Sequence, residues 1–123
     1  MKLWKYSGTF LWITGIIHIV VGFLIGKDIY AEMLRDGLVN SMKNDFTRSF
    51  AFWFFLFGVL LILYGYTLQY NIKREQKPSP IHVGYTLLVI SVFGCLVEPI
   101  SGFWLVLPQA LIIIVANRKS ARN

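Results

Sequence analysis

The sequence predicts an all-α protein, a four-helix transmembrane bundle with up-down-up-down topology and a short amphipathic helix in its first external loop. The 123 residues are 56% hydrophobic and only 15% charged, whereas soluble domains carry about 25% charged residues. The apolar residues form four long runs without formal charge, and the Lys and Arg residues lie just outside these runs. We therefore expect a single membrane domain over residues 1–123.

The four runs cover residues 6–26, 49–70, 81–97 and 100–116. A helix needs roughly 20 apolar residues to cross about 30 Å of hydrocarbon. The first two runs reach this length and the last two come close, so we expect each run to form one span. The first run follows Lys2 and Lys5, as the core of a secretory signal would. It is longer than such a core and no small-x-small cleavage site follows it, which favours a retained anchor.

Basic residues predict the orientation of the spans, because cytoplasmic loops of membrane proteins are rich in Lys and Arg. Eight lie at the N-terminus, in the loop at residues 71–80 and in the C-terminal tail: Lys2, Lys5, Lys73, Arg74, Lys77, Arg118, Lys119 and Arg122. In the external segment at residues 27–48, four basic residues are balanced by four acidic ones. We expect both termini in the cytoplasm, a bacterial plasma (inner) membrane location and contact with membrane lipids. Because the positive charge flanks apolar runs, it does not favour nucleic-acid binding.

The external segment has an amphipathic pattern. Apolar residues recur every four positions at Tyr30, Leu34, Leu38, Met42 and Phe46. This spacing fits a helix lying on the membrane or over the mouth of the bundle, and a plain connecting loop is the alternative. Gly37 would weaken such a helix midway.

Small or polar residues recur every seven positions in each run. The four stripes are Gly8, Gly15 and Gly22; Ala51, Gly58 and Gly65; Gly84, Ser91 and Glu98; and Gly102, Gln109 and Ala116. A seven-residue period keeps one side of a helix against its neighbour, and small residues allow close approach in membranes. We expect the stripes to face inward. The G-x-x-x-G at residues 22–26 also leaves a homo-oligomer open.

Ionisable residues inside a membrane are costly and are candidates for function. His18 lies slightly past the middle of the first run, with Thr14 one turn away as a hydrogen-bond partner. Glu98 ends the third run before Pro99, and non-helical backbone at that depth needs protein or a water-filled cavity beside it. We therefore expect a pocket at the outer mouth, with Arg48 beside Glu98. The alternatives are a structural histidine bridge and a structural Arg48–Glu98 ion pair.

The candidate ligand-binding residues are His18, Arg48, Trp53, Glu98, Trp104 and Gln109. Gln109 is more typical of hydrogen bonds between membrane helices than of ligand sites. A lone Cys95 excludes an internal disulfide and a multi-cysteine metal site. Because no H-E-x-x-H, phosphate loop or Ser/His/Asp set occurs, we expect no metal, no cofactor and no catalytic residues. Catalysis would need His18 and Glu98 as acid and base.

Two motifs, RSFAFWFFLFG at residues 48–58 and EPISGFWL at residues 98–105, occur together with the histidine of WITGIIHIVVG at residues 12–22. With them, nearly the whole chain resembles a family of small bacterial four-span membrane proteins classed only as a domain of unknown function. More distantly, it is similar to DoxX-like proteins. The resemblance implies a plasma-membrane location and no established activity.

Three functional hypotheses follow. The first is a non-enzymatic membrane module that binds a small apolar or lipid-like ligand, or a partner, at its outer mouth. The second is a small proton-coupled transporter, although small multidrug exporters need a carboxylate in the first span, where this chain has His18. The third is a membrane enzyme acting on a lipid or quinone with His18 and Glu98.

Overall fold

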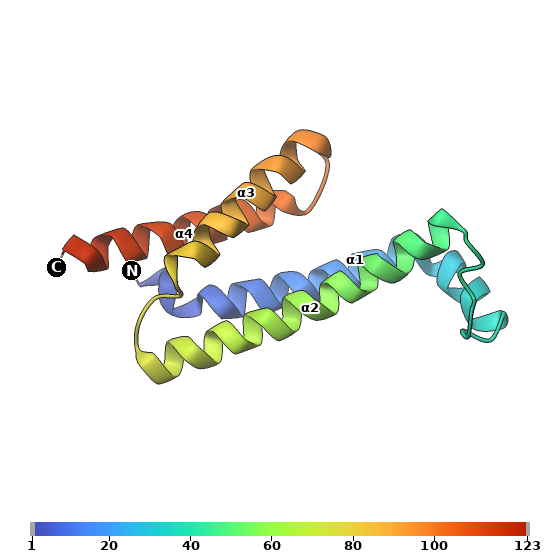
Figure 1. Ribbon diagram of the computed structural model, residues 1–123, viewed down its shortest axis with the longest axis horizontal. Helices are drawn as coiled ribbons and strands as arrows, with labels where there is room; N and C mark the ends of the chain where they lie inside the picture. Colours follow the sequence, from blue (N-terminus) through green and yellow to red (C-terminus); the bar gives the residue numbers. More distant parts are fainter. Residues whose placement is uncertain (1, 123) are drawn as a thin grey trace.

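The computed structural model describes residues 2–122, and these residues form helices joined by turns. A short 3₁₀ turn, η1 (Leu3–Tyr6), leads into four α-helices: α1 (Ser7–Arg35), α2 (Phe46–Glu75), α3 (Ile81–Val97) and α4 (Phe103–Arg122). Successive helices run in opposite directions, so both ends of the chain lie at one end of the molecule (Figure 1). The prediction of an all-α chain with four helices is confirmed. We refer to the end that holds the chain termini as the terminal end, and to the opposite end of α1 and α2, at residues 36–45, as the loop end.

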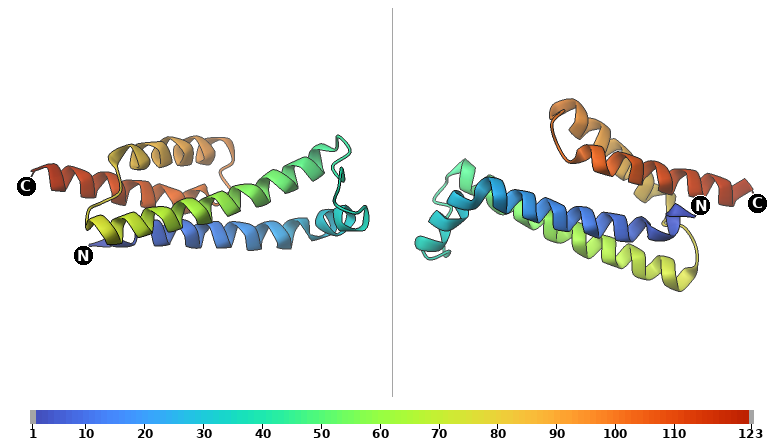
Figure 2. Two further views of the ribbon diagram at one scale, coloured as in Figure 1. Left: turned by 60° about the horizontal axis from the view of Figure 1, so that its bottom comes forward. Right: turned by 180° about the vertical axis from the view of Figure 1, so that it is seen from behind.

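The helices form two hairpins rather than one evenly packed bundle. Helix α1 packs along α2 and α3 packs along α4, while α4 approaches α1. Within residues 2–122, the backbone of α3 packs closely only against α4. Figures 1 and 2 show the α3–α4 hairpin leaning away from α1 and α2 with increasing distance from the terminal end. Side chains of all four helices still share one core, made of Leu11, Leu68, Val83, Leu87, Val106, Ala110 and Ile113, while the small residue Gly84 of α3 faces α4.

Glycines bring the backbones of α1 and α2 together. A Cβ placed on Gly8 would lie 2.5 Å from the carbonyl oxygen of Gly65, and one on Gly65 would lie 2.7 Å from that of Gly8. Two helical turns further along α1, a Cβ on Gly15 would lie 2.9 Å from the carbonyl oxygen of Gly58. The neighbours are backbone atoms, which cannot move unless the helices move. The small-residue stripes of the first two runs therefore face each other, as predicted.

In the stripes of the last two runs, some residues are packed against a neighbouring helix and others are exposed. A Cβ on Gly84 would meet the side chains of α4, and Ser91 is completely buried. Glu98 is exposed, and Gly102 has no atom near enough to contact an added Cβ. These two residues belong to the α3–α4 turn at residues 98–102, beyond the packed part of the hairpin.

The helix bounds differ from the apolar runs at the loop end. Helix α1 bends at Gly26 (φ −101°, ψ 15°) and continues to Arg35, so the first half of the predicted amphipathic helix is an extension of α1. Residues 36–45 form turns, and Gly37, with φ +90°, lies just beyond the helix end, whereas the sequence predicted a helix that continues past this glycine and is weakened there. Asp45 caps α2 by accepting a hydrogen bond of 2.8 Å from the amide of Thr47.

The other boundaries also shift by a few residues. Helix α2 extends to Glu75, so the connection to α3 shortens to residues 76–80, which contain Pro78 and Pro80. Gln76 ends α2 in the left-handed conformation with φ 53°. Helix α4 begins at Phe103, which leaves residues 98–102 for the turn between α3 and α4.

The outer surface of the helices is largely apolar. Among residues 2–122, two segments are long and apolar enough to cross a membrane, Leu3–Arg35 and Phe46–Glu75, and α3 is apolar but shorter. Large apolar side chains on all four helices are exposed, for example Leu24, Phe50, Leu63, Phe93 and Leu111. Soluble monomers rarely expose contiguous apolar patches beyond a few hundred Å², and larger ones mark contact with a membrane or a partner.

Candidate functional site

His18 lies on α1 and is held by aromatic side chains of α2. Its ring stacks on that of Phe54, with centroids 3.8 Å apart and planes inclined by 17°, and meets the edge of Phe57 at 5.4 Å. The Nε2 atom lies 3.0 Å from the carbonyl oxygen of Phe54. A carbonyl only accepts, so Nε2 carries a proton and donates. In the neutral imidazole, Nδ1 is then an acceptor.

Gly58 makes room for this histidine. A Cβ at Gly58 would lie 3.2 Å from Cδ2 of His18 and closer still to Ile19. The seven-residue stripe of α2 therefore has two consequences, since it lets the helices approach and leaves space for the imidazole ring.

Gln109 joins the two hairpins one helical turn away from His18. Its side chain is 8% exposed, and Nε2 donates to Oγ1 of Thr14 (2.7 Å) and to the carbonyl oxygen of Leu105 (2.9 Å). The hydroxyl of Thr14 donates to the carbonyl of Phe10 (2.7 Å), so the predicted bond between Thr14 and His18 is wrong. Within residues 2–122, the buried Oε1 of Gln109 has no hydrogen-bond partner.

Side-chain exposure changes along one face of α1. Leu11, Thr14, His18, Val21 and Ile25 follow one another at intervals of three or four residues and so share this face. Leu11 is 1% exposed, whereas Val21 is 40% and Ile25 is 81% exposed. His18 lies between these extremes and is half-buried. His18 therefore lies where this face of α1 passes from buried to exposed.

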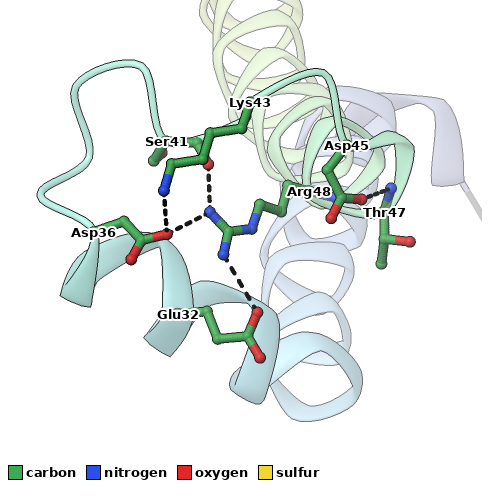
Figure 3. A network of polar contacts seen from close by, with 7 residues as sticks. All are labelled: Glu32, Asp36, Ser41, Lys43, Asp45, Thr47 and Arg48. Carbon is green, nitrogen blue, oxygen red and sulfur yellow. Dashed lines mark hydrogen bonds and ion pairs between the residues drawn. The ribbon is translucent and has the colours of Figure 1, made fainter.

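Arg48 is the centre of a separate polar cluster at the loop end (Figure 3). One guanidinium nitrogen donates to Oδ2 of Asp36 (2.7 Å) and to the carbonyl oxygen of Ser41 (2.5 Å). The other lies 3.5 Å from a carboxylate oxygen of Glu32, and Lys43 pairs with Asp36 at 3.3 Å. The Arg48 side chain is only 14% exposed. The cluster thus ties the turns at residues 36–45 to the first turn of α2.

The predicted pairing of Arg48 with Glu98 is wrong. Because α1 extends to Arg35, its polar side carries Glu32 and Asp36 to the start of α2. These residues are four apart, and both reach the same guanidinium group.

The charges in this cluster depend on one another. The hydrogen bond from Arg48, followed by the contribution of Lys43, lowers the pKa of Asp36 below its ordinary value. Asp36 in turn raises the pKa of Arg48. Both groups are therefore charged at neutral pH, as a structural clasp requires.

The remaining candidates do not join His18. Glu98 is exposed at the α3–α4 turn, and its carboxylate has no hydrogen bond or ion pair with any residue of the described chain, although its backbone amide donates to the carbonyl oxygen of Gly94 (2.8 Å). Trp104 is exposed and donates from Nε1 to the carbonyl oxygen of Pro99 (2.8 Å), and Trp53 is exposed on α2. The structure therefore joins Gln109 to Thr14, one turn before His18 on α1, and leaves the other predicted residues apart.

The pattern of one protein family matches residues 2–120, which is nearly the whole chain. The chain belongs to DUF6463, a family of unknown function. No curated protein and no solved structure matches the DUF6463 chain.

Sequence reasoning missed Gln69, a buried residue of the DUF6463 chain. Its Oε1 accepts from the amide of Thr9 (3.0 Å), and its Nε2 donates to the carbonyl oxygen of Lys5 (2.8 Å). The first amides of a helix lack partners within the helix, so Gln69 acts as a cap supplied by α2. Its position four residues after Gly65, as the one amide in the second apolar run, was the available signal.

No group of three or more His, Cys, Asp or Glu side chains within residues 2–122 is arranged to hold a metal ion. The contacts of His18 on α2 are one hydrogen bond and two aromatic contacts.

Proposed function

We propose that this chain is a four-span inner-membrane protein with both termini in the cytoplasm. In this proposal it holds one apolar or lipid-like molecule between its two helical hairpins, against His18, and catalyses no reaction. The ligand site then lies beside the point where α4 leaves α1, rather than at a mouth formed by Glu98 and Arg48.

Length, surface and charge support the membrane placement. Helix α3 has 17 residues and so rises about 26 Å, close to the hydrocarbon thickness of about 30 Å. The large exposed apolar side chains would face lipid. Eight basic residues and one acidic residue gather at the terminal end, whereas the four basic residues of segment 27–48 are balanced. This asymmetry favours a cytoplasmic terminal end.

The observation that carries the ligand proposal is the rise in exposure along one face of α1, from 1% at Leu11 to 81% at Ile25. Apolar side chains beyond His18 on this face are exposed, and an apolar molecule lying between the hairpins would cover them in the membrane. The Nδ1 atom of His18, which has no hydrogen-bond partner within residues 2–122, would offer one acceptor beside this wall. An apolar molecule with a single hydrogen-bond donor matches these features.

The geometry lends no support to the proton-coupled transporter or to the lipid or quinone enzyme. Catalysis with His18 as one member of an acid–base pair needs a second proton carrier near it. The polar and aromatic contacts of His18 come from Phe54 and Phe57 on α2, and Glu98 is exposed in the other hairpin.

The test is to purify the protein from membranes and to identify bound small molecules by mass spectrometry. Val21→Trp places a bulky side chain on the face that carries His18, and Val20→Trp makes the same change on a neighbouring exposed face. We expect a copurified apolar molecule that is lost in V21W and His18→Ala and retained in V20W. A protein that carries no such molecule, or one whose content is unaffected by V21W, would refute the proposal.

A further inference from the structure

We infer that the terminal end contains a specific site for the headgroup of an anionic phospholipid, in a groove beneath the connection between α2 and α3. This inference rests on the membrane placement proposed above, and it concerns a different end of the molecule from the ligand beside His18.

The groove has a volume of about 360 Å³ and is formed by the last turns of α2 and by residues 77–80. Ile72, Pro78 and Pro80 contribute apolar surface, and Asn71, Arg74 and Lys77 contribute polar groups. The headgroup region of a bilayer offers the same combination, since phosphate lies next to glycerol and the first methylenes of the acyl chains.

Two cations in the groove are available to an anion. Arg74 donates from Nε to Glu75 (3.0 Å) and lies 5.8 Å from the ring centre of Tyr70. Its two terminal nitrogens have no hydrogen bond to the described chain, and neither does the ammonium group of Lys77. Glu75 also lines the groove and opposes an anion. It is the one acidic residue at an end that carries eight basic residues, so the surrounding field is strongly positive.

A buried hydroxyl provides an independent observation. Ser79 lines the groove and is 3% exposed, and its Oγ has no hydrogen-bond partner in the part of the chain that the structure describes. Its position is fixed, because its carbonyl oxygen accepts from Nδ2 of Asn117 (2.7 Å). A buried hydroxyl without a partner is costly. A small opening of the groove would let this hydroxyl donate to a phosphate oxygen.

The basic charge of the groove and its apolar walls favour an anionic lipid headgroup as the occupant. A zwitterionic lipid brings a cation that the basic surroundings repel, whereas an anionic headgroup brings only negative charge. A free soluble phosphate would gain nothing from the apolar walls of the groove.

The protein in nanodiscs or mixed micelles should be titrated with phosphatidylglycerol and with phosphatidylcholine, and bound lipid counted by native mass spectrometry. Arg74→Gln combined with Lys77→Gln removes both groove cations. Lys119→Gln combined with Arg122→Gln removes equal charge from the tail. We expect phosphatidylglycerol to bind more tightly than phosphatidylcholine, and the groove variant to bind it about tenfold more weakly. The tail variant should retain most of the affinity, and Ser79→Ala, which keeps all charges, should weaken only phosphatidylglycerol.

Equal weakening by the two charge pairs would overturn the inference, because it would mean diffuse attraction. Absence of a preference for phosphatidylglycerol would also overturn it. Either result in a protein extracted from membranes leaves the function proposed above intact, whereas recovery in the soluble fraction would overturn both.

Discussion

Replacing Gly65 by alanine should force α1 and α2 apart. The added Cβ would lie 2.7 Å from the carbonyl oxygen of Gly8 and 2.9 Å from Cα of Trp12, and ordinary contact begins at 3.4 Å. The backbone nitrogen of Trp12 would lie closer still, so the helices must separate by more than roughly 0.7 Å at this point, the difference between 3.4 and 2.7 Å. Over-packing of this kind costs about 1–3 kcal/mol, and alanine recovers about 1 kcal/mol of helix propensity. Because the neighbours are backbone atoms, we expect the upper part of the range and a net loss of about 2 kcal/mol.

The assay is equilibrium unfolding in mixed micelles by SDS titration, followed by circular dichroism. Gly102→Ala is the control, since an added Cβ there meets no atom, and its effect should stay within about 0.5 kcal/mol. Gly84→Ala should fall between the two, because its nearest neighbour at 2.8 Å is the flexible side chain of Ile114. A G65A variant as stable as G102A would refute the close backbone contact of α1 and α2.

Two further predictions concern polar groups. Arg48→Gln should raise the pKa of Asp36 toward its ordinary value of 3.8, as measured by NMR titration, and should speed hydrogen exchange in residues 36–45. Because the folded-state pKa of Asp36 is depressed, the stability that Asp36 contributes to the native loop is fully present above pH 3.8 and is lost as the pH falls through the lower folded-state pKa. Hydrogen exchange in residues 36–45 should therefore become faster on acidification in the wild type, and the change should be much smaller in R48Q. Gln109→Leu removes the bond to Thr14 together with the unpartnered Oε1, so stability should change by less than about 1 kcal/mol in the SDS assay. A loss of several kcal/mol would show that the amide bridge holds the hairpins together.

Local patterns predicted the contacts within the first hairpin. The stripe of Gly8 and Gly15 faces that of Gly58 and Gly65, because only small residues let two membrane helices approach so closely. Gly37 was predicted to weaken a helix, and it lies just beyond the end of α1 with positive φ.

Contacts over longer distances were not predictable from the sequence. The partner of Arg48 depends on how far α1 continues past Gly26, and the end of an apolar run does not show where a helix ends. The separation of the two hairpins was also not predictable from the hydropathy of the sequence. Residues such as Val21 and Ile25 are apolar whether they face lipid, a ligand or another helix, so hydropathy does not distinguish these environments.

The central claim is that four spans place both chain ends on the cytoplasmic side of the membrane. Single-cysteine variants Asn40→Cys, Lys77→Cys and Ser120→Cys, made after Cys95→Ser, can be labelled in whole cells with a membrane-impermeant maleimide. We expect labelling of N40C in intact cells, and labelling of K77C and S120C only after the membrane is opened. Positions 77 and 120 on opposite faces of the membrane, or positions 40 and 77 on the same face, would contradict the four-span arrangement.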